Sequence, residues 1–176
     1  MNLSHKQITL KPQDLLVLFK IACNKEKPFT YAQLAGEIGT SASEAHSGLR
    51  RASLARLVFE SEAGVVIQRA AFRDFVLHGA RYCFPASLGA PTSGMPTGYA
   101  VAPLRELIVQ SDELPPVWPQ PHGSVRGIAL YPLYRTVPAA AARDKALYEC
   151  LALFDALRAG AARERELAAQ LLGERI

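Results

Sequence analysis

Short polar and basic side chains recur between residues 41 and 56, and most of them fall on one side of a helix. They are Ser41, Ser43, His46, Ser47, Arg50, Arg51 and Arg56. Serine and histidine can hydrogen-bond base edges, and arginine can grip a guanine bidentately or hold a phosphate. The set therefore predicts contact with nucleic acid. The expected base readers are Ser43, His46, Ser47 and Arg50, and the expected phosphate contacts are Arg51 and Arg56.

Each of these side chains also has a plainer interpretation. Ser41 or Ser43 can cap the helix that follows by accepting a backbone N–H. His46 is equally well explained as an exposed histidine. Arg51 can pair with a carboxylate inside its own domain, and any one of the arginines can simply be solvated. The group is therefore a better prediction than any of its members.

Two helices separated by a tight turn must position this set. Leu34, Ala35 and Ile38 are spaced as on a short helix that ends at Gly39, where a positive φ costs glycine nothing. A second helix is expected over residues 43–55. Ala45, Leu49 and Ala52 form its buried stripe, and Gly48 inside it costs roughly 1 kcal/mol relative to alanine.

The flanking segments predict a helix before this pair and a hairpin after it. Residues 12–23 have a helical apolar face, and Pro12 suits the first turn. Residues 57–60 and 65–69 predict two short strands joined by a turn at 61–64. The turn is acidic, with Glu60 and Glu62, so this hairpin offers little to a phosphate. Residues 70–80 predict a linking helix with Phe72, Phe75 and Val76 facing inward.

These predicted elements follow the order of a winged helix-turn-helix, which has two helices, then an outward-facing helix and then a two-stranded wing. Residues 10–80 resemble the winged-helix regulators of the MarR type, with threonine at position 40 where the motif usually has an aliphatic residue. The resemblance implies a dimer that binds double-stranded DNA and regulates nearby genes, with repression as the expected sign.

Bulk properties fit that expectation without establishing it. The net charge is +4, and the basic excess is +3 over residues 1–80 against +1 over residues 81–176. No apolar run suits a signal peptide or a membrane span, so we expect a cytoplasmic protein with no membrane contact. Three widely spaced cysteines predict neither a disulfide framework nor a zinc site. No catalytic motif is present, so we expect no enzyme and no cofactor.

The middle of the chain is rich in proline, since ten of the twelve prolines lie between residues 85 and 138. Residues 85–98 are expected to be irregular, because proline and glycine disfavour both helix and central strand. This loop is either a surface connection or a partner-binding strap with Tyr99 and Trp118 nearby. Residues 128–134 predict a short edge strand that Pro132 interrupts.

The C-terminal part is expected to be a helical hairpin. Asp144 suits the N-cap of a helix that runs to Ala159, and Gly160 is expected to end it. A second helix is expected over residues 161–172, with Leu167 and Leu171 as its stripe and Gly173 as its stop. Its narrow apolar stripe must pack on the first domain, on a second copy or on another protein.

Three segments of the second half carry another resemblance. They are GMPTGYAVAPL at 94–104, LYPLYRTVP at 130–138 and LYECLALFDALRAGAARERELA at 147–168. They resemble the C-terminal part of bacterial winged-helix proteins, some of which belong to toxin–antitoxin operons beside nucleotidyltransferase-like toxins. This resemblance implies a protein that represses its operon and also binds a partner protein.

Together these observations predict an α+β, mainly α protein with three parts. Residues 1–80 are the winged helix-turn-helix domain, 81–137 a Pro/Gly-rich connecting segment with short strands, and 138–176 helices for dimerisation or partner binding. The expected function is sequence-specific transcription regulation. The alternative is an antitoxin-like interaction module that binds a protein through the middle and the tail. A third possibility is a small-molecule sensor whose pocket is lined by Tyr82, Phe84, Tyr99, Trp118, Tyr131 and Tyr134.

Overall fold

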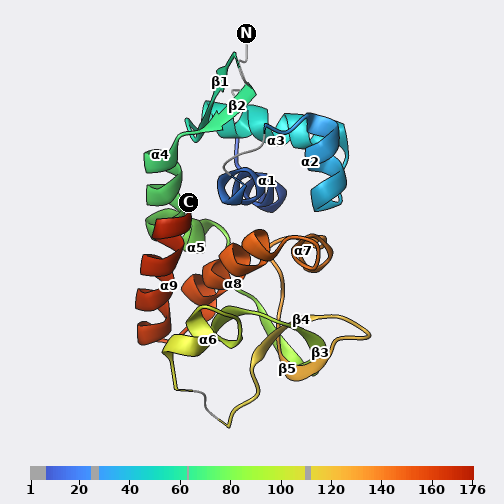
Figure 1. The fold of residues 1–176 in the computed structure, drawn as a ribbon, viewed down its shortest axis with the longest axis vertical. Coiled ribbons are helices and arrows are strands. Elements are labelled where there is room, and N and C mark those ends of the chain that lie inside the picture. Colours follow the sequence, from blue (N-terminus) through green and yellow to red (C-terminus); the bar gives the residue numbers. More distant parts are fainter. Residues whose placement is uncertain (1–6, 25–27, 63, 110–111) are drawn as a thin grey trace.

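The computed structural model describes residues 7–24, 28–62, 64–109 and 112–176, and it is a mainly helical α+β structure. It begins with α1 (Pro12–Cys23), α2 (Tyr31–Ile38) and α3 (Ala42–Leu54) (Figure 1). The hydroxyls of Thr30 and Ser41 accept backbone N–H groups at the starts of α2 and α3. Gly39 ends α2 with φ +71°. The expected helix pair and its glycine turn are therefore confirmed.

A two-stranded hairpin follows α3. Strands β1 (Val58–Ser61) and β2 (Gly64–Ile67) are antiparallel, with Val58 opposite Ile67 and Phe59 opposite Val66. The expected hairpin is confirmed, with its strands displaced by one or two residues. Ser61 and Gly64 are paired, so the connection is shorter than the predicted four-residue turn. Residue 63, which that prediction included, lies outside the described residues.

The linking helix is present and longer than expected. It comprises α4 (Arg69–Asp74), a π-helical turn (Phe75–Gly79) and α5 (Ala80–Cys83). Phe72 and Val76 are fully buried, as predicted, and Phe75 is half-buried.

The prediction that residues 85–98 are irregular is wrong, because β3 (Leu88–Pro96) occupies most of them. It pairs antiparallel with β4 (Pro116–Pro119) and β5 (Val125–Leu130), which pair parallel with each other and close a small barrel. Each pairing is short, and the β3–β5 register shifts between Leu88 and Pro91, so the prolines interrupt few hydrogen bonds. Gly94 is required here, since a Cβ on it would lie 2.2 Å from the Trp118 carbonyl oxygen.

The predicted edge strand at 128–134 is displaced. β5 starts at Val125 and ends at Leu130, before Pro132, and it pairs with both other strands of the barrel. Between β3 and β4 the chain forms a 3₁₀ turn (Gly98–Ala100) and the short helix α6 (Leu104–Leu107).

The C-terminal segment contains α7 (Val137–Ala141), α8 (Lys145–Ala159) and α9 (Ala162–Arg175). Asp144 caps α8 and Gly160 follows its last residue, as expected. Gly173 does not stop α9, which continues to Arg175. It is buried instead, and a Cβ there would lie 3.4 Å from the side chains of Arg73 and Leu77. The buried positions of α9 are accordingly Ala168 and Leu172, whereas the predicted stripe of Leu167 and Leu171 is only half-buried.

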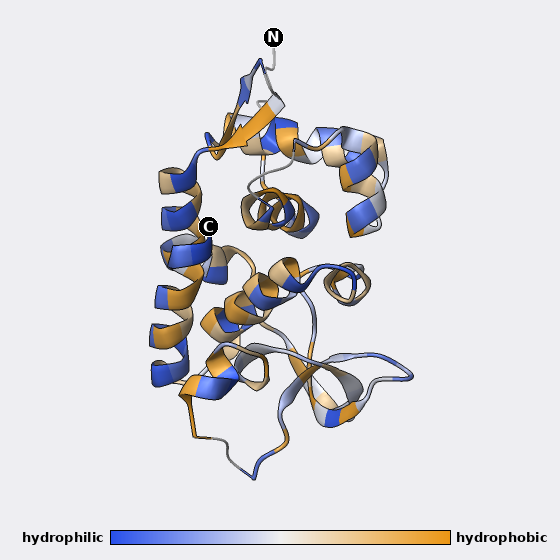
Figure 2. Cartoon of the chain, in the orientation of Figure 1, coloured by the Kyte–Doolittle hydropathy of each residue, from blue (hydrophilic) through white to orange (hydrophobic). Residues whose placement is uncertain are grey.

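One hydrophobic core joins the first helices to the C-terminal ones. Almost every side chain of α8 from Leu147 to Leu157 is buried, and α8 lies between α1 and the barrel (Figure 1). The ring of Phe19 on α1 packs 5.3 Å from Phe154 on α8 and 5.6 Å from Phe72 on α4. Hydropathic colouring shows hydrophobic residues on α1 and α8 and a hydrophilic outer side on α9 (Figure 2). The C-terminal helices therefore pack on the N-terminal part, one of the three possibilities the sequence left open.

No helix within the described ranges is both long and apolar enough to cross a bilayer.

Candidate nucleic-acid interface

The outward side of α3 is uncovered. Ser43, His46 and Arg50 are exposed and Ser47 is half-buried. The predicted inner stripe is confirmed, because Ala45, Leu49 and Ala52 are all buried. The barrel and α7–α9 lie on the far side of α1 and leave this face open (Figure 1). Ser41 serves as the cap: its Oγ accepts the Glu44 N–H at 3.1 Å.

Arg51 makes an internal ion pair. Its Nε and Nη2 each donate to Asp14 at 2.7 Å, and the Asp14 side chain is fully buried. The same carboxylate accepts the Lys11 N–H at 2.8 Å. The hydrogen bonds to Asp14 raise the pKa of Arg51. Of the two roles expected for Arg51 the structure shows the pairing within the protein, so its guanidinium fastens α3 to α1.

Gly48 has a packing role that the sequence did not indicate. It is buried on the α1 side of α3, and a Cβ at this position would lie 2.8 Å from Asp14 Oδ1. Glycine lowers the stability of the helix, but it lets the Asp14 carboxylate come close to α3. The ion pair with Arg51 requires this close approach.

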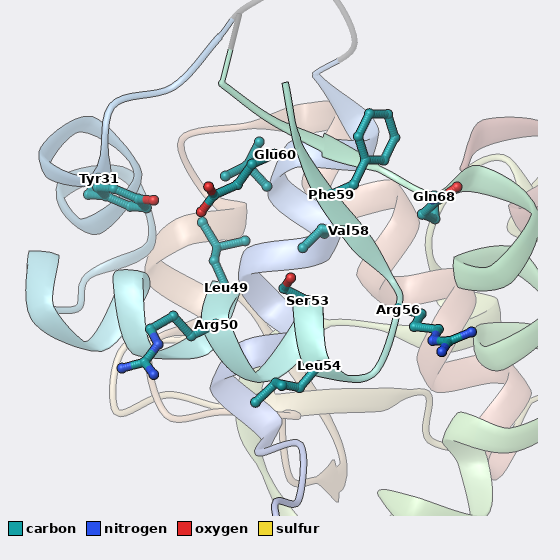
Figure 3. Close-up of a pocket in the computed structure, with 11 residues that line it drawn as sticks. Tyr31, Leu49, Arg50, Ser53, Leu54, Arg56, Val58, Phe59, Glu60 and Gln68 are labelled. Atoms are coloured by element: carbon teal, nitrogen blue, oxygen red, sulfur yellow. The ribbon is translucent and has the colours of Figure 1, made fainter. Parts of the chain in front are cut away.

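A groove runs between α3 and the β1–β2 hairpin (Figure 3). Its lining residues are Tyr31, Leu49, Arg50, Ser53, Leu54, Arg56, Val58, Phe59, Glu60, Val65 and Gln68. A second groove lies on the other side of α3 and is lined by residues 7–12 with Ser47, Arg50, Arg51 and Leu54. Arg50 and Leu54 line both grooves, so α3 forms a ridge between two depressions.

Arg56 occupies an unusual position beside the first groove. It has φ +58°, and it is the one non-glycine residue with positive φ in the part of the chain that the structure describes. Such a conformation costs a residue with a Cβ of order 1 kcal/mol or more. Glycine would relieve that strain but would remove the exposed guanidinium.

His46 is held from the side by α2. The ring of Tyr31 meets the His46 imidazole edge-on, with centroids 5.0 Å apart. The contact leaves the imidazole exposed on the outward side of α3.

The charge around α3 is mixed. Arg50, Arg56 and Arg69 are exposed on or near the ridge, but Glu44, Glu60 and Glu62 are exposed there as well. Figure 3 shows the Glu60 carboxylate turned toward the α3 side of β1. Any attraction for phosphate must therefore come from individual arginines and not from a broad positive field.

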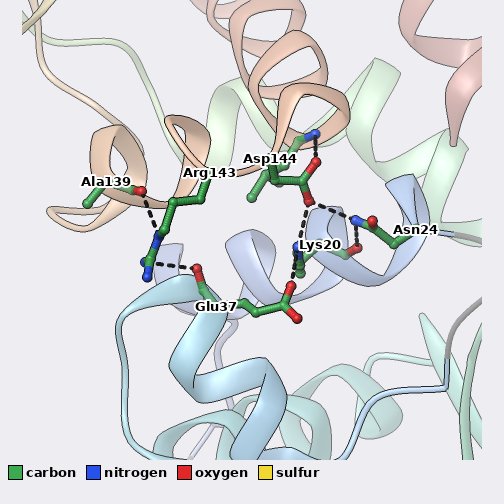
Figure 4. A network of polar contacts seen from close by, with 7 residues as sticks. Lys20, Asn24, Glu37, Ala139, Arg143 and Asp144 are labelled. Atoms are coloured by element: carbon green, nitrogen blue, oxygen red, sulfur yellow. Dashed lines mark hydrogen bonds and ion pairs between the residues drawn. The ribbon is translucent and has the colours of Figure 1, made fainter.

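A part-buried polar network connects α1 and α2 to the C-terminal segment (Figure 4). The Lys20 ammonium contacts Asp144 at 2.5 Å and also pairs with Glu37. Asn24 donates to the Asp144 carboxylate at 2.9 Å, and Arg143 donates to the Glu37 carbonyl at 3.1 Å. These contacts tie α1 and α2 to the start of α8, so the ridge is carried on a single packed body.

The aromatic residues considered for a small-molecule pocket are not gathered in one place. Trp118 is fully buried and donates its Nε1–H to Asp155 at 2.6 Å, and Phe84 is buried as well. Tyr82 and Tyr131 are exposed to 70% and 52%. Trp118 is therefore part of the core and is not available to a partner-binding strap. Across the described segments no group of three or more His, Cys, Asp or Glu residues could hold a metal ion.

No protein-family model, curated protein or solved structure significantly matches the chain.

Proposed function

We propose that this chain is a winged-helix DNA-binding transcription regulator of the MarR-like kind, with α3 as its recognition helix and the β1–β2 hairpin as its wing. The observation that carries the proposal is the uncovered polar face of α3, raised between two grooves. A DNA major groove is wide enough to admit one α-helix, and a ridge flanked by depressions lets the duplex backbones lie on either side.

The side chains of this surface have two different proposed roles, base reading and phosphate binding. Ser43, His46, Ser47 and Arg50 face outward along α3 and are placed to read base edges. Arg56, at the base of the wing, holds a phosphate, and this role accounts for an arginine in a left-handed conformation. Arg51 contributes to DNA binding indirectly, because its pair with Asp14 sets the orientation of α3 against α1. We propose that the protein acts in the cytoplasm as a dimer on a two-part operator, with repression as the sign of regulation.

Selection from a random pool of duplex DNA tests this proposal. The full chain is expected to enrich one sequence, and the enriched duplex should bind the chain more tightly than a scrambled duplex of equal composition. Binding should weaken with added salt, because phosphate contacts release counterions. Absence of enrichment, together with equal binding of the selected and scrambled duplexes, would show that the protein does not recognise a specific DNA sequence.

A second function, an antitoxin-like protein-interaction module, is favoured by apolar side chains on the other half of the molecule. Leu88 on β3 and Tyr131 after β5 are exposed to 62% and 52%, and Tyr82 on α5 to 70%. Tyrosine is enriched at protein interfaces. Co-purification of the tagged chain from its native host separates the two functions: a stoichiometric protein partner without DNA affinity would favour the module.

A further inference from the structure

A small pocket lies between the barrel and the junction of α8 and α9, on the half of the molecule away from α3 (Figure 1). Its volume is about 180 Å³. Leu88 on β3 and Ile128 on β5 line the barrel side, and Ala156, Ala159 and Gly160 line the helical side. These last three residues carry at most a methyl group, which leaves room for a side chain from another molecule.

Two exposed leucines lie at the opening of this pocket. Leu88 and Leu114 both line it, and they are exposed to 62% and 41%. Covering them would be favourable, because apolar surface would be removed from water. The pocket and its opening therefore suit an apolar group.

The charged groups of the lining are acidic. Asp155 is neutralised by its ion pair with Arg158. Glu164 is half-buried, and its carboxylate accepts the Ala161 N–H at 3.0 Å but forms no salt bridge with a described residue. Glu113 supplies a further carboxylate. None of the described lining residues is a lysine, arginine or histidine, so the charge of the site complements a cationic group beside the apolar one.

The size of the pocket indicates how much of a partner it receives. Pockets for drug-sized ligands usually measure ~300–1,000 Å³, whereas this one has room for a single side chain. We propose that the pocket receives one apolar side chain of a partner protein, and that a lysine or arginine next to it in the partner meets the Glu164 carboxylate. This inference rests on the protein-interaction function proposed above, for which it names the chemistry of the partner, and it is independent of DNA binding.

NMR titration of the isotopically labelled full chain with short capped peptides tests the site. The probe is a peptide with one leucine between two arginines and a glycine at each end. It is expected to shift the amide signals of Ala159 and Gly160. A peptide with serine in place of leucine should bind about 10-fold more weakly, because the apolar side chain is lost. A peptide with glutamates in place of the arginines should also bind more weakly, since its charges repel Glu164.

Two variants of the chain locate the binding. Ala159→Trp is expected to abolish it by filling the pocket, whereas Ala139→Trp, at an exposed alanine of α7, should bind as the wild type does. Glu164→Gln keeps an acceptor for the N–H at the start of α9 and loses only the charge, so affinity for the arginine peptide should fall about 2- to 5-fold. Glu166→Gln is the matched control, since that side chain is 70% exposed and does not line the pocket.

Several results would overturn the proposal. They are an absence of shifts at Ala159 and Gly160, equal affinity of the leucine–arginine peptide and either of its counterparts, and undiminished binding by Ala159→Trp. If Ala159→Trp instead abolishes self-association of the chain in sedimentation equilibrium, the occupant is a second copy and the assignment to a partner protein is wrong. A partner that co-purifies equally well with the wild type and with Ala159→Trp would preserve the protein-interaction function but show that it does not use this pocket.

Discussion

The guanidinium of Arg51 grips the carboxylate of Asp14 through two hydrogen bonds of 2.7 Å, and this pair joins the proposed recognition helix to α1. Both groups are removed from solvent, the Asp14 side chain completely. A buried pair of this kind adds little net stability relative to apolar side chains of similar size, but it is costly to break by removing one partner. The orientation of α3, and with it the reach of Arg50, therefore depends on a contact on the opposite side of the helix.

Asp14→Ala is expected to lower the free energy of unfolding by about 3 kcal/mol, because Arg51 loses its partner in a largely buried position. Urea denaturation followed by circular dichroism measures the change. Gln13→Ala is the control: within the described residues the Gln13 side chain donates a long, exposed hydrogen bond to Glu44, and its removal should cost at most about 0.5 kcal/mol. Equal stabilities of the two variants would show that breaking the pair costs no stability.

Gly48→Ala should destabilise the protein although alanine is the better helix former. The added Cβ would lie 2.8 Å from Asp14 Oδ1. Gly36→Ala, in α2, is the matched control, since a Cβ there meets nothing within 4 Å. That variant is expected to gain about 0.5–1 kcal/mol from helix propensity. Thermal denaturation compares the two, and a shift in the same direction for both would contradict the packing argument.

Lys20→Met is expected to cost about 3 kcal/mol of unfolding free energy, because it leaves Asp144 and Glu37 without the ammonium that they share. Lys145→Met provides the control, since the Lys145 side chain is 88% exposed and its pair with Glu149 is loose. Chemical denaturation of both variants should separate them clearly. A Lys20→Met protein as stable as the Lys145→Met protein would mean that the network contributes little.

The same network predicts a loss of stability in acid. Burial alone would raise the pKa of Asp144, but hydrogen bonds from Lys20, the Leu147 N–H and Asn24 lower it below its ordinary value of 3.8. A carboxyl whose pKa is lower in the folded state stabilises the protein above that ordinary value, and the contribution is lost as pH falls through the folded pKa. The wild-type unfolding free energy should therefore decline below about pH 3.8 more steeply than that of Asp144→Asn. Parallel curves would contradict the assignment.

At high pH the sign reverses for Lys20. Burial alone would lower its pKa, but hydrogen bonds to Asp144 and Glu37 raise it above 10.5. Its contribution is complete below that value and is lost as pH rises through the folded pKa.

Locally encoded features could be predicted from the sequence. The α2–α3 turn depends on Gly39 and Ser41, and the stripe of α3 depends on the spacing of Ala45, Leu49 and Ala52. These are properties of neighbouring residues, so the chain reveals them without its tertiary structure. The hairpin and the Asp144 cap belong to the same class.

Features that depend on distant partners could not be predicted. Prolines and glycines in β3 suggested a loop, but Gly94 is needed because Trp118 passes so close. Gly173 suggested a helix stop, whereas α9 continues through it and packs it against Arg73 and Leu77. The pairing of Asp14 with Arg51 links residues 37 apart, and neither residue type identifies the other. In the candidate site the exposed face of α3 and an internal carboxylate pair of Arg51 were foreseeable, but the identity of that carboxylate as Asp14 was not.

Binding of the selected duplex by the wild type, Arg50→Ala and Arg163→Ala, followed by fluorescence anisotropy, tests most directly whether the α3 ridge meets DNA. The Arg163→Ala substitution on α9 also removes one positive charge. The Arg163 side chain is 70% exposed and lies far from α3. If Arg50 reads a guanine, its loss should weaken binding by ~1–3 kcal/mol, which corresponds to about 5- to 150-fold, and Arg163→Ala should bind as the wild type does. Arg50→Ala and Arg163→Ala proteins that both retain wild-type affinity would contradict the account.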